Sequence, residues 1–160
     1  MPVRRFNLGG SIVDPALLAD IVEVEQLLAR YAAGMTRNDV DAVLDVFTPD
    51  GTYSAFGETY GLADFPVLVA AAPKGLYAVS TPALDLDSEA GTGTGTQPLC
   101  FVAQTDHAMR IGYYTDTYLR TGNGWRLRTR AMTFLRRNGA HDSGKPHDPR
   151  RPKPTGKPAS

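Results

Sequence analysis

The chain has 160 residues, the size of one domain that can bury its own apolar core. Its 17 lysine and arginine residues balance 17 aspartate and glutamate residues. A net charge of zero argues against nucleic acid as the main partner, because phosphate binding needs a clustered basic excess. The N-terminus does not resemble a signal peptide, and no apolar stretch reaches membrane-spanning length. We therefore expect a cytoplasmic protein with no membrane contact.

The first predicted element is a long helix. Asp14-Pro15 suits a helix start, because the aspartate can accept hydrogen bonds from free backbone N–H groups and proline fits the first turn. Apolar residues then recur at three- and four-residue spacing up to about Gly34, and Tyr31 lies on this stripe. Asn38-Asp39 predicts the start of a second, shorter helix, which Pro49-Asp50-Gly51 ends. The two helices are expected to form a helical hairpin.

The chain after the helical hairpin is predicted to contain one more helix and otherwise strands. A strand over 52–56 precedes a third helix, which begins at Asp64 and ends at Pro73-Lys74-Gly75. The Gly-Thr repeat at 91–96 lacks the lysine and the following helix of a phosphate-binding loop, so it predicts a strand with small residues on one face. The later strands are predicted over 76–86, 92–105, 109–119 and 125–136.

These elements predict an α+β fold in which three N-terminal helices pack on one side of a cone-shaped, strongly curved antiparallel sheet. The cone domain is expected to span residues 14–137, after an N-terminal arm of residues 1–13. Residues 138–160 are rich in Pro, Gly and Lys and have no apolar periodicity, so we expect a tail that is disordered or packed against a partner. The tail holds two His-Asp pairs without a preformed ligand geometry, and no metal is expected there.

The longest predicted hairpin carries the main ionisable candidate. Period-two alternation directs Tyr114, Asp116 and Tyr118 to the same face of the sheet. Asp116 either forms a cross-strand ion pair with Arg128, whose parity matches, or faces a pocket. Two alternatives also stay open for the Tyr31 hydroxyl, which either makes a hydrogen bond within the core or faces a ligand.

Several short segments together carry a family resemblance. They are Arg30-Tyr31-Ala32, Asn38-Asp39-Val40-Asp41, residues 46–53, Tyr114-Thr115-Asp116 and residues 124–130. In these segments the chain resembles the SnoaL-like branch of the nuclear transport factor 2-like superfamily, over about Leu17 to Leu135. The resemblance implies the cone fold. That superfamily mixes dehydratases, isomerases, epoxide hydrolases and proteins without known chemistry, so the fold alone assigns no activity.

Comparison with particular members of the superfamily implies a set of catalytic residues. Members similar to ketosteroid isomerase use a tyrosine and a protonated aspartate to donate hydrogen bonds to an oxyanion, and Tyr31 and Asp116 match these. Their carboxylate base on the first strand is absent, since residues 53–56 contain no acid. His107 is a weak candidate for the base, because its position is more typical of a solvated turn. The catalytic residues of members similar to scytalone dehydratase and limonene epoxide hydrolase are also incompletely matched in this chain.

The resemblance therefore implies a pocket protein that binds a small, mostly apolar metabolite of the polyketide, steroid or terpenoid class. Isomerase or dehydratase proton transfer, without a cofactor, would use Tyr31 and Asp116. The alternative is a non-catalytic binding or accessory subunit, similar to a dioxygenase β subunit, that has lost the base. We also expect a homodimer through the outer face of the sheet. The expected ligand contacts are Tyr53, Phe56, Tyr77, Tyr114 and Arg130.

Overall fold

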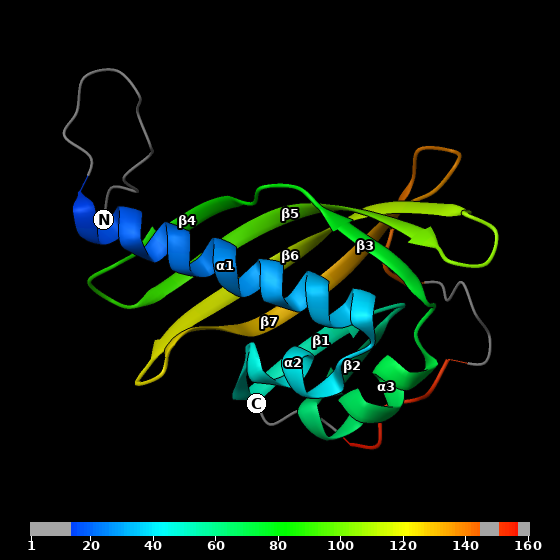
Figure 1. Ribbon diagram of the computed structural model, residues 1–160, viewed down its shortest axis with the longest axis horizontal. Helices are drawn as coiled ribbons and strands as arrows, with labels where there is room; N and C mark the ends of the chain where they lie inside the picture. The colour runs from blue at the N-terminus through cyan, green and yellow to red at the C-terminus, as the bar shows by residue number, and fades with distance from the viewer. Residues whose placement is uncertain (1–13, 145–150, 157–160) are drawn as a thin grey trace.

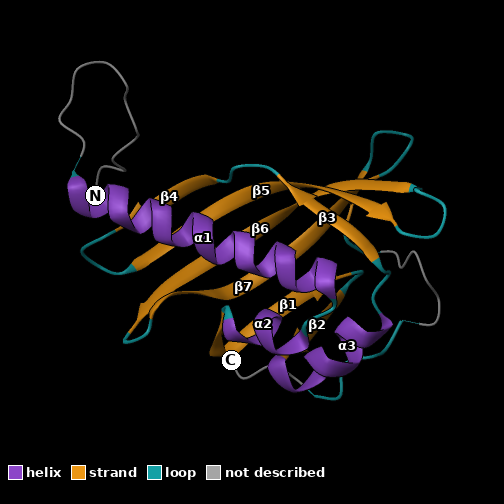
Figure 2. Cartoon of the chain, viewed as in Figure 1, coloured by secondary structure: helices purple, strands orange, loops and turns teal. Residues whose placement is uncertain are grey.

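A computed structural model describes residues 14–144 and 151–156 of the chain, and the arm predicted over residues 1–13 lies outside this part. The helices are α1 (Pro15–Arg37), α2 (Val40–Asp45) and α3 (Phe65–Ala71), with a short 3₁₀ turn η1 (Leu62–Asp64) before α3. They lie on one side of an eight-stranded sheet, as Figures 1 and 2 show. This arrangement confirms the predicted α+β fold. None of the helices described is long and apolar enough to cross a membrane.

The curved sheet is mixed. Its strands are β1 (Phe47–Ala55), β2 (Glu58–Gly61), β3 (Gly75–Val79), β4 (Ala83–Asp87), β5 (Thr92–Ala103), β6 (Met109–Thr121), β7 (Gly124–Leu135) and β8 (His141–Asp142). The hydrogen-bonded order is β2-β1-β7-β6-β5-β3, and β4 also pairs with β5 and β8 with β7. Neighbouring strands are antiparallel except β1 and β7, which run parallel. Alternation in a sequence does not reveal strand direction, so the parallel pair was not predictable from it.

Several predicted boundaries differ from the structure. Strand β1 begins at Phe47, and Pro49 lies within it instead of ending a helix. The register of β1 against β7 shifts between Phe47 and Thr52, so the missing N–H of Pro49 interrupts no regular ladder. The strand predicted over 76–86 is two strands, β3 and β4. Residues 80–82 interrupt the strand, and the segments on both sides of them pair with β5. Strand β2 was not predicted.

Helix α1 begins where its sequence predicts and runs past the predicted end at about Gly34 to Arg37. The Asp14 carboxylate accepts a hydrogen bond from the backbone N–H of Ala16 at 3.0 Å. Asn38 ends the helix in the left-handed conformation, with φ of 58°, and its N–H returns to the Gly34 carbonyl. The buried stripe of α1 packs across the sheet (Figure 2), which places Tyr31 in the core.

The β6–β7 hairpin confirms one prediction and corrects another. Tyr114, Asp116 and Tyr118 are all buried on the inner face. Arg128 is not the partner of Asp116: a bulge between the Tyr118–Leu127 and Thr117–Thr129 pairs leaves Arg128 as an extra residue, and Arg130 lies opposite Asp116. Arg128 is half exposed and instead lies 3.8 Å from an Asp50 carboxylate oxygen.

The predicted tail packs, in the residues that the structure describes, on the chain's own domain. Residues 141–142 pair with β7, and the His141 Nδ1 lies 3.0 Å from the Tyr113 hydroxyl. Residues 151–156, red in Figure 1, run past α3 and β2. The Tyr60 hydroxyl donates to the Pro152 carbonyl at 2.8 Å, and Lys153 pairs with Glu58 at 2.6 Å. The second His-Asp pair, at 147–148, lies outside the described residues.

Candidate functional site

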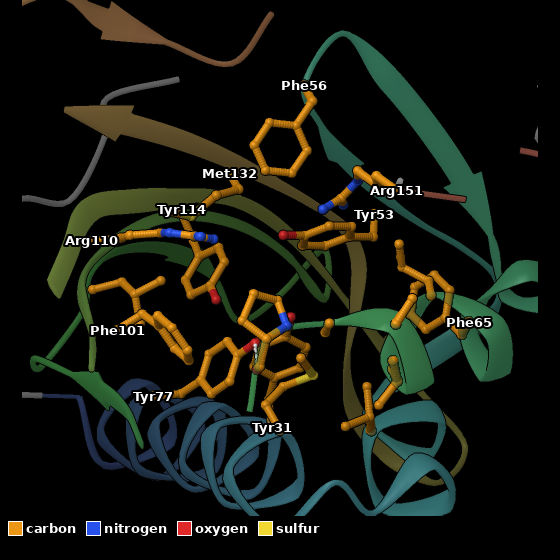
Figure 3. A pocket seen from close by; sticks show the side chains of 18 of the residues that line it. Tyr31, Tyr53, Phe56, Phe65, Tyr77, Phe101, Arg110, Tyr114, Met132 and Arg151 are labelled. Carbon is orange, nitrogen blue, oxygen red and sulfur yellow. Dashed lines mark hydrogen bonds between the residues drawn. The ribbon is translucent and has the colours of Figure 1, made fainter. Parts of the chain in front are cut away.

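A cavity of about 90 Å³ lies between the helices and the sheet (Figure 3). Most of its wall is apolar or aromatic, with side chains from α1, α3, β1, β3, β5, β6 and β7. The polar side chains in the wall belong to four tyrosines and two arginines: Tyr31, Tyr53, Tyr77, Tyr114, Arg110 and Arg151. None of the lining residues in the described part of the chain has a carboxylate or an imidazole.

Tyr31 reaches the cavity from α1. Its ring makes edge contacts with Phe47 and Tyr114, at centroid distances of 6.1 and 5.8 Å. Burial raises the pKa of the Tyr31 phenol well above its ordinary value, so the group stays protonated at neutral pH. A side-chain hydrogen bond with the neighbouring Tyr114 acts in the opposite direction and lowers this pKa, but burial outweighs it. Tyr31 is therefore a neutral phenol that lines the cavity beside Tyr114.

The other three cavity tyrosines are also neutral donors. Burial raises the pKa of Tyr53, Tyr77 and Tyr114 above that of a free phenol. The Tyr77 hydroxyl donates to the Pro73 carbonyl at 3.3 Å, and its backbone N–H donates to Thr36. These contacts hold β3 against the last turn of α1 and the loop after α3, and leave a wall that can bind oxygen atoms without supplying a base.

Asp116 and Arg130 form a buried ion pair next to the cavity. The side chains of both are 0% exposed. Arg130 donates from Nε and Nη2 to the two carboxylate oxygens at 2.9 and 2.8 Å, and the Tyr118 hydroxyl donates to Asp116 at 2.9 Å. Gln97 accepts from Arg130 at 3.0 Å. The carboxylate is thus engaged by donors from its own sheet.

The Arg130 guanidinium lies between two cavity tyrosines. Its central carbon is 4.4 Å from the ring centre of Tyr31 and 3.8 Å from that of Tyr114. Burial alone would lower the pKa of Arg130, but Asp116 outweighs it and the pKa lies above its usual value. The charged pair therefore sits behind the aromatic wall and supports the rings of Tyr31 and Tyr114.

The structure brings most of the predicted site residues together. Tyr31 lines the cavity, as do the predicted ligand contacts Tyr53, Phe56, Tyr77 and Tyr114. Asp116 and Arg130 lie in the layer behind it. His107 is separate from this group, because it occupies an exposed turn between β5 and β6 with φ of 56°.

Other lining residues were missed at the sequence level. Arg110, Met132 and Phe134 alternate with known inward residues on β6 and β7, so period-two counting could have found them. Phe134 stacks on Phe56 at 5.2 Å. Arg151 carried no such signal, because it lies in a segment without apolar periodicity and reaches the cavity only through tertiary packing.

The site lies in a recognised domain. A model of the SnoaL-like domain matches residues 16–131 of the chain. The chain belongs to the SnoaL-like family. This match covers the helices and almost all of the sheet that surrounds the cavity.

A curated relative and several solved structures are similar to most of the chain. The chain is 28% identical over 141 residues to the uncharacterized protein Rv2910c of Mycobacterium tuberculosis, covering 79% of this chain and 92% of that protein. An NTF2-like protein with a cystatin-like fold from Novosphingobium aromaticivorans is similar with a TM-score of 0.67 and 21% identity, covering 77% of this chain and 88% of that one. A hexachlorocyclohexane dehydrochlorinase, LinA type 2, is similar with a TM-score of 0.67 and 13% identity, covering 86% of this chain and 99% of that one. These likenesses establish the fold.

Proposed function

We propose that this SnoaL-like protein binds a small, mostly apolar metabolite in the cavity that Tyr31, Tyr53, Tyr77 and Tyr114 line. The observation that carries the proposal is the composition of the wall: aromatic and aliphatic groups with protonated phenols among them. Such a wall desolvates an apolar body and orients it through a few hydrogen bonds to its oxygen atoms. Of the polyketide, steroid and terpenoid classes, the cavity volume favours small members with one ring.

Binding without chemistry is the form of this function that the wall supports best. Proton abstraction needs a base within hydrogen-bond reach of the substrate, and the described lining residues offer neither a carboxylate nor an imidazole. Asp116 resembles the aspartate of ketosteroid isomerase in sequence position, but it accepts three hydrogen bonds within its own sheet. We assign Asp116 a supporting role, through Arg130, in holding the aromatic wall.

A screen of neutral hydrophobic compounds by thermal shift tests this function on the full chain. A compound that binds the folded state raises the melting temperature by mass action. The variant Ala72→Phe places a ring in the wall and should abolish the shift. Ala70→Phe, at an exposed position two residues earlier in α3 and outside the wall, is the matched control and should keep the shift. Shifts that survive Ala72→Phe, or product formation from a bound compound, would contradict binding without chemistry in this cavity.

We further propose a homodimer that forms through the outer face of the sheet. Leu76, Met109 and Ile111 lie on this face and are 52%, 70% and 50% exposed. They belong to β3 and β6 on either side of β5, where Leu76 and Met109 both pair with Val102, so they form one apolar surface. Light scattering should report twice the monomer mass, and Ile111→Asp should return the protein to a monomer. A wild-type monomer at micromolar concentration would refute the dimer.

A further inference from the structure

Two arginines lie at the cavity without an acidic partner among the described residues. Arg110 comes from β6 and Arg151 from the C-terminal segment, and both are half-buried. In Figure 3 they point toward each other from opposite sides of the cavity, with the Tyr53 hydroxyl between them. Residues that are far apart in the chain thus direct two positive charges at one place.

The ion pairs in the described part of the chain leave both arginines out. Asp116 is paired with Arg130, and Glu58 is paired with Lys153. Arg110 makes no hydrogen bond or ion pair with a described residue. Arg151 donates from Nε to the Tyr60 hydroxyl at 3.1 Å and is also a hydrogen-bond partner of the Tyr53 side chain. The cavity wall therefore carries positive charge at Arg110 and Arg151 that no acidic side chain of the described residues pairs with.

Aromatic contacts hold the Arg151 guanidinium in place. Its central carbon lies 4.0 Å from the ring centre of Phe56 and 5.3 Å from that of Tyr60. The Pro152 carbonyl accepts a hydrogen bond from Tyr60, which fixes the neighbouring backbone. Arg151 is therefore oriented in advance of binding, beside the Tyr53 hydroxyl and without an acidic partner among the described residues.

We propose that the ligand is a compact apolar carboxylate whose carboxyl group is held between Arg110 and Arg151 while its hydrocarbon body enters the aromatic cavity. A guanidinium presents parallel N–H donors that match the two oxygens of a carboxylate, and burial beside apolar groups strengthens such a contact. The Tyr53 hydroxyl supplies a third donor at the same place. This inference rests on the proposed function and names the chemical class that the site takes.

The size of the cavity limits the hydrocarbon body. Its volume of about 90 Å³ is smaller than the roughly 150 Å³ of an apolar cavity that holds benzene. A single small ring that stays partly in the mouth, or a short branched chain, fits this space. Benzoate and isovalerate are therefore suitable probes, and benzamide and isovaleramide match their shapes without the charge.

Calorimetric titration of the full chain with these four probes tests the proposal. Each acid should bind at least about tenfold more tightly than its amide, as expected for charge-assisted hydrogen bonds. Arg110→Gln and Arg151→Gln should each weaken acid binding by about tenfold or more and leave amide binding unchanged. Arg110→Lys keeps the charge but loses the paired donors, so it should weaken acid binding less. Arg128→Gln, outside the cavity wall, is the matched control and should change nothing.

Other results would overturn the inference. Equal affinity for acid and amide would remove the carboxylate site but leave the proposed function intact, because the cavity would still bind. If Arg110→Gln and Arg151→Gln both bind the acids as tightly as the wild type, the carboxylate site is also refuted. Circular dichroism checks that both variants are folded. If neither the probes nor the neutral compounds of the thermal-shift screen bind, the proposed function fails together with the inference.

Discussion

Replacement of Asp116 by asparagine removes the negative half of an ion pair whose side chains are 0% exposed. The carboxylate accepts hydrogen bonds from Arg130 at 2.9 and 2.8 Å and from the Tyr118 hydroxyl at 2.9 Å. Asparagine keeps the shape, but its amide presents an NH₂ group to these donors. Arg130 then keeps a buried charge without a counterion. We expect the free energy of unfolding to fall by about 3–5 kcal/mol.

This loss is large compared with the whole stability of a domain, which is about 5–15 kcal/mol. For a chain of this size it corresponds to a melting temperature lowered by roughly 6 to 20 °C. The surface pair of Asp50 and Arg128 is a matched control, because its N–O distance is 3.8 Å and both side chains are about half exposed. Asp50→Asn should cost less than about 0.5 kcal/mol.

Urea unfolding followed by tryptophan fluorescence measures these differences. Trp125 is the single tryptophan and is fully buried, so its emission reports on loss of the core. The double variant Asp116→Leu with Arg130→Met removes both charges and should recover most of the stability that Asp116→Asn loses. A loss below about 1 kcal/mol for Asp116→Asn would refute the account of a buried, mutually dependent pair.

Three further predictions concern groups in the same core. Because burial raises their pKa, five of the seven tyrosines should stay protonated in the folded protein above pH of about 10. Their stabilising effect should disappear as pH rises further. Ultraviolet absorbance measures this ionisation, and ionisation of all seven at a pH of about 10 would contradict the prediction. Burial acts to raise the pKa of Asp20, but the Ser88 hydroxyl, Trp125 and Arg120 outweigh this and lower it. Asp20→Asn should therefore destabilise at neutral pH and progressively less as pH falls below about 4, and a pH-independent loss in urea unfolding would count against the shift. Gly95→Ala would put a Cβ atom 2.8 Å from Leu84 and 3.0 Å from the Tyr118 hydroxyl, so it should cost about 1–3 kcal/mol, and an unchanged urea midpoint would show that the strand relaxes.

Local sequence periodicity determined which face most side chains occupy. The stripe on α1 places Tyr31 inward, and alternation on β6 places Tyr114, Asp116 and Tyr118 inward. These predictions succeeded because a helix or strand repeats on the scale of a few residues, and one turn or one pleat is enough to assign a face. The start of α1 was predicted for the same reason, since the cap at Asp14 acts within a few residues.

Tertiary structure alone decided which of these residues meet. The bulge at Arg128 moved the partner of Asp116 to Arg130, because one inserted residue shifts the register of everything beyond it. The parallel pairing of β1 with β7 depends on how the chain between them crosses the fold. Arg151 reaches the cavity through contacts with Phe56 and Tyr60, which lie far away in the sequence. Periodicity carries no information about such distant partners, so the aromatic wall followed from the sequence, and the charges around it followed from the fold.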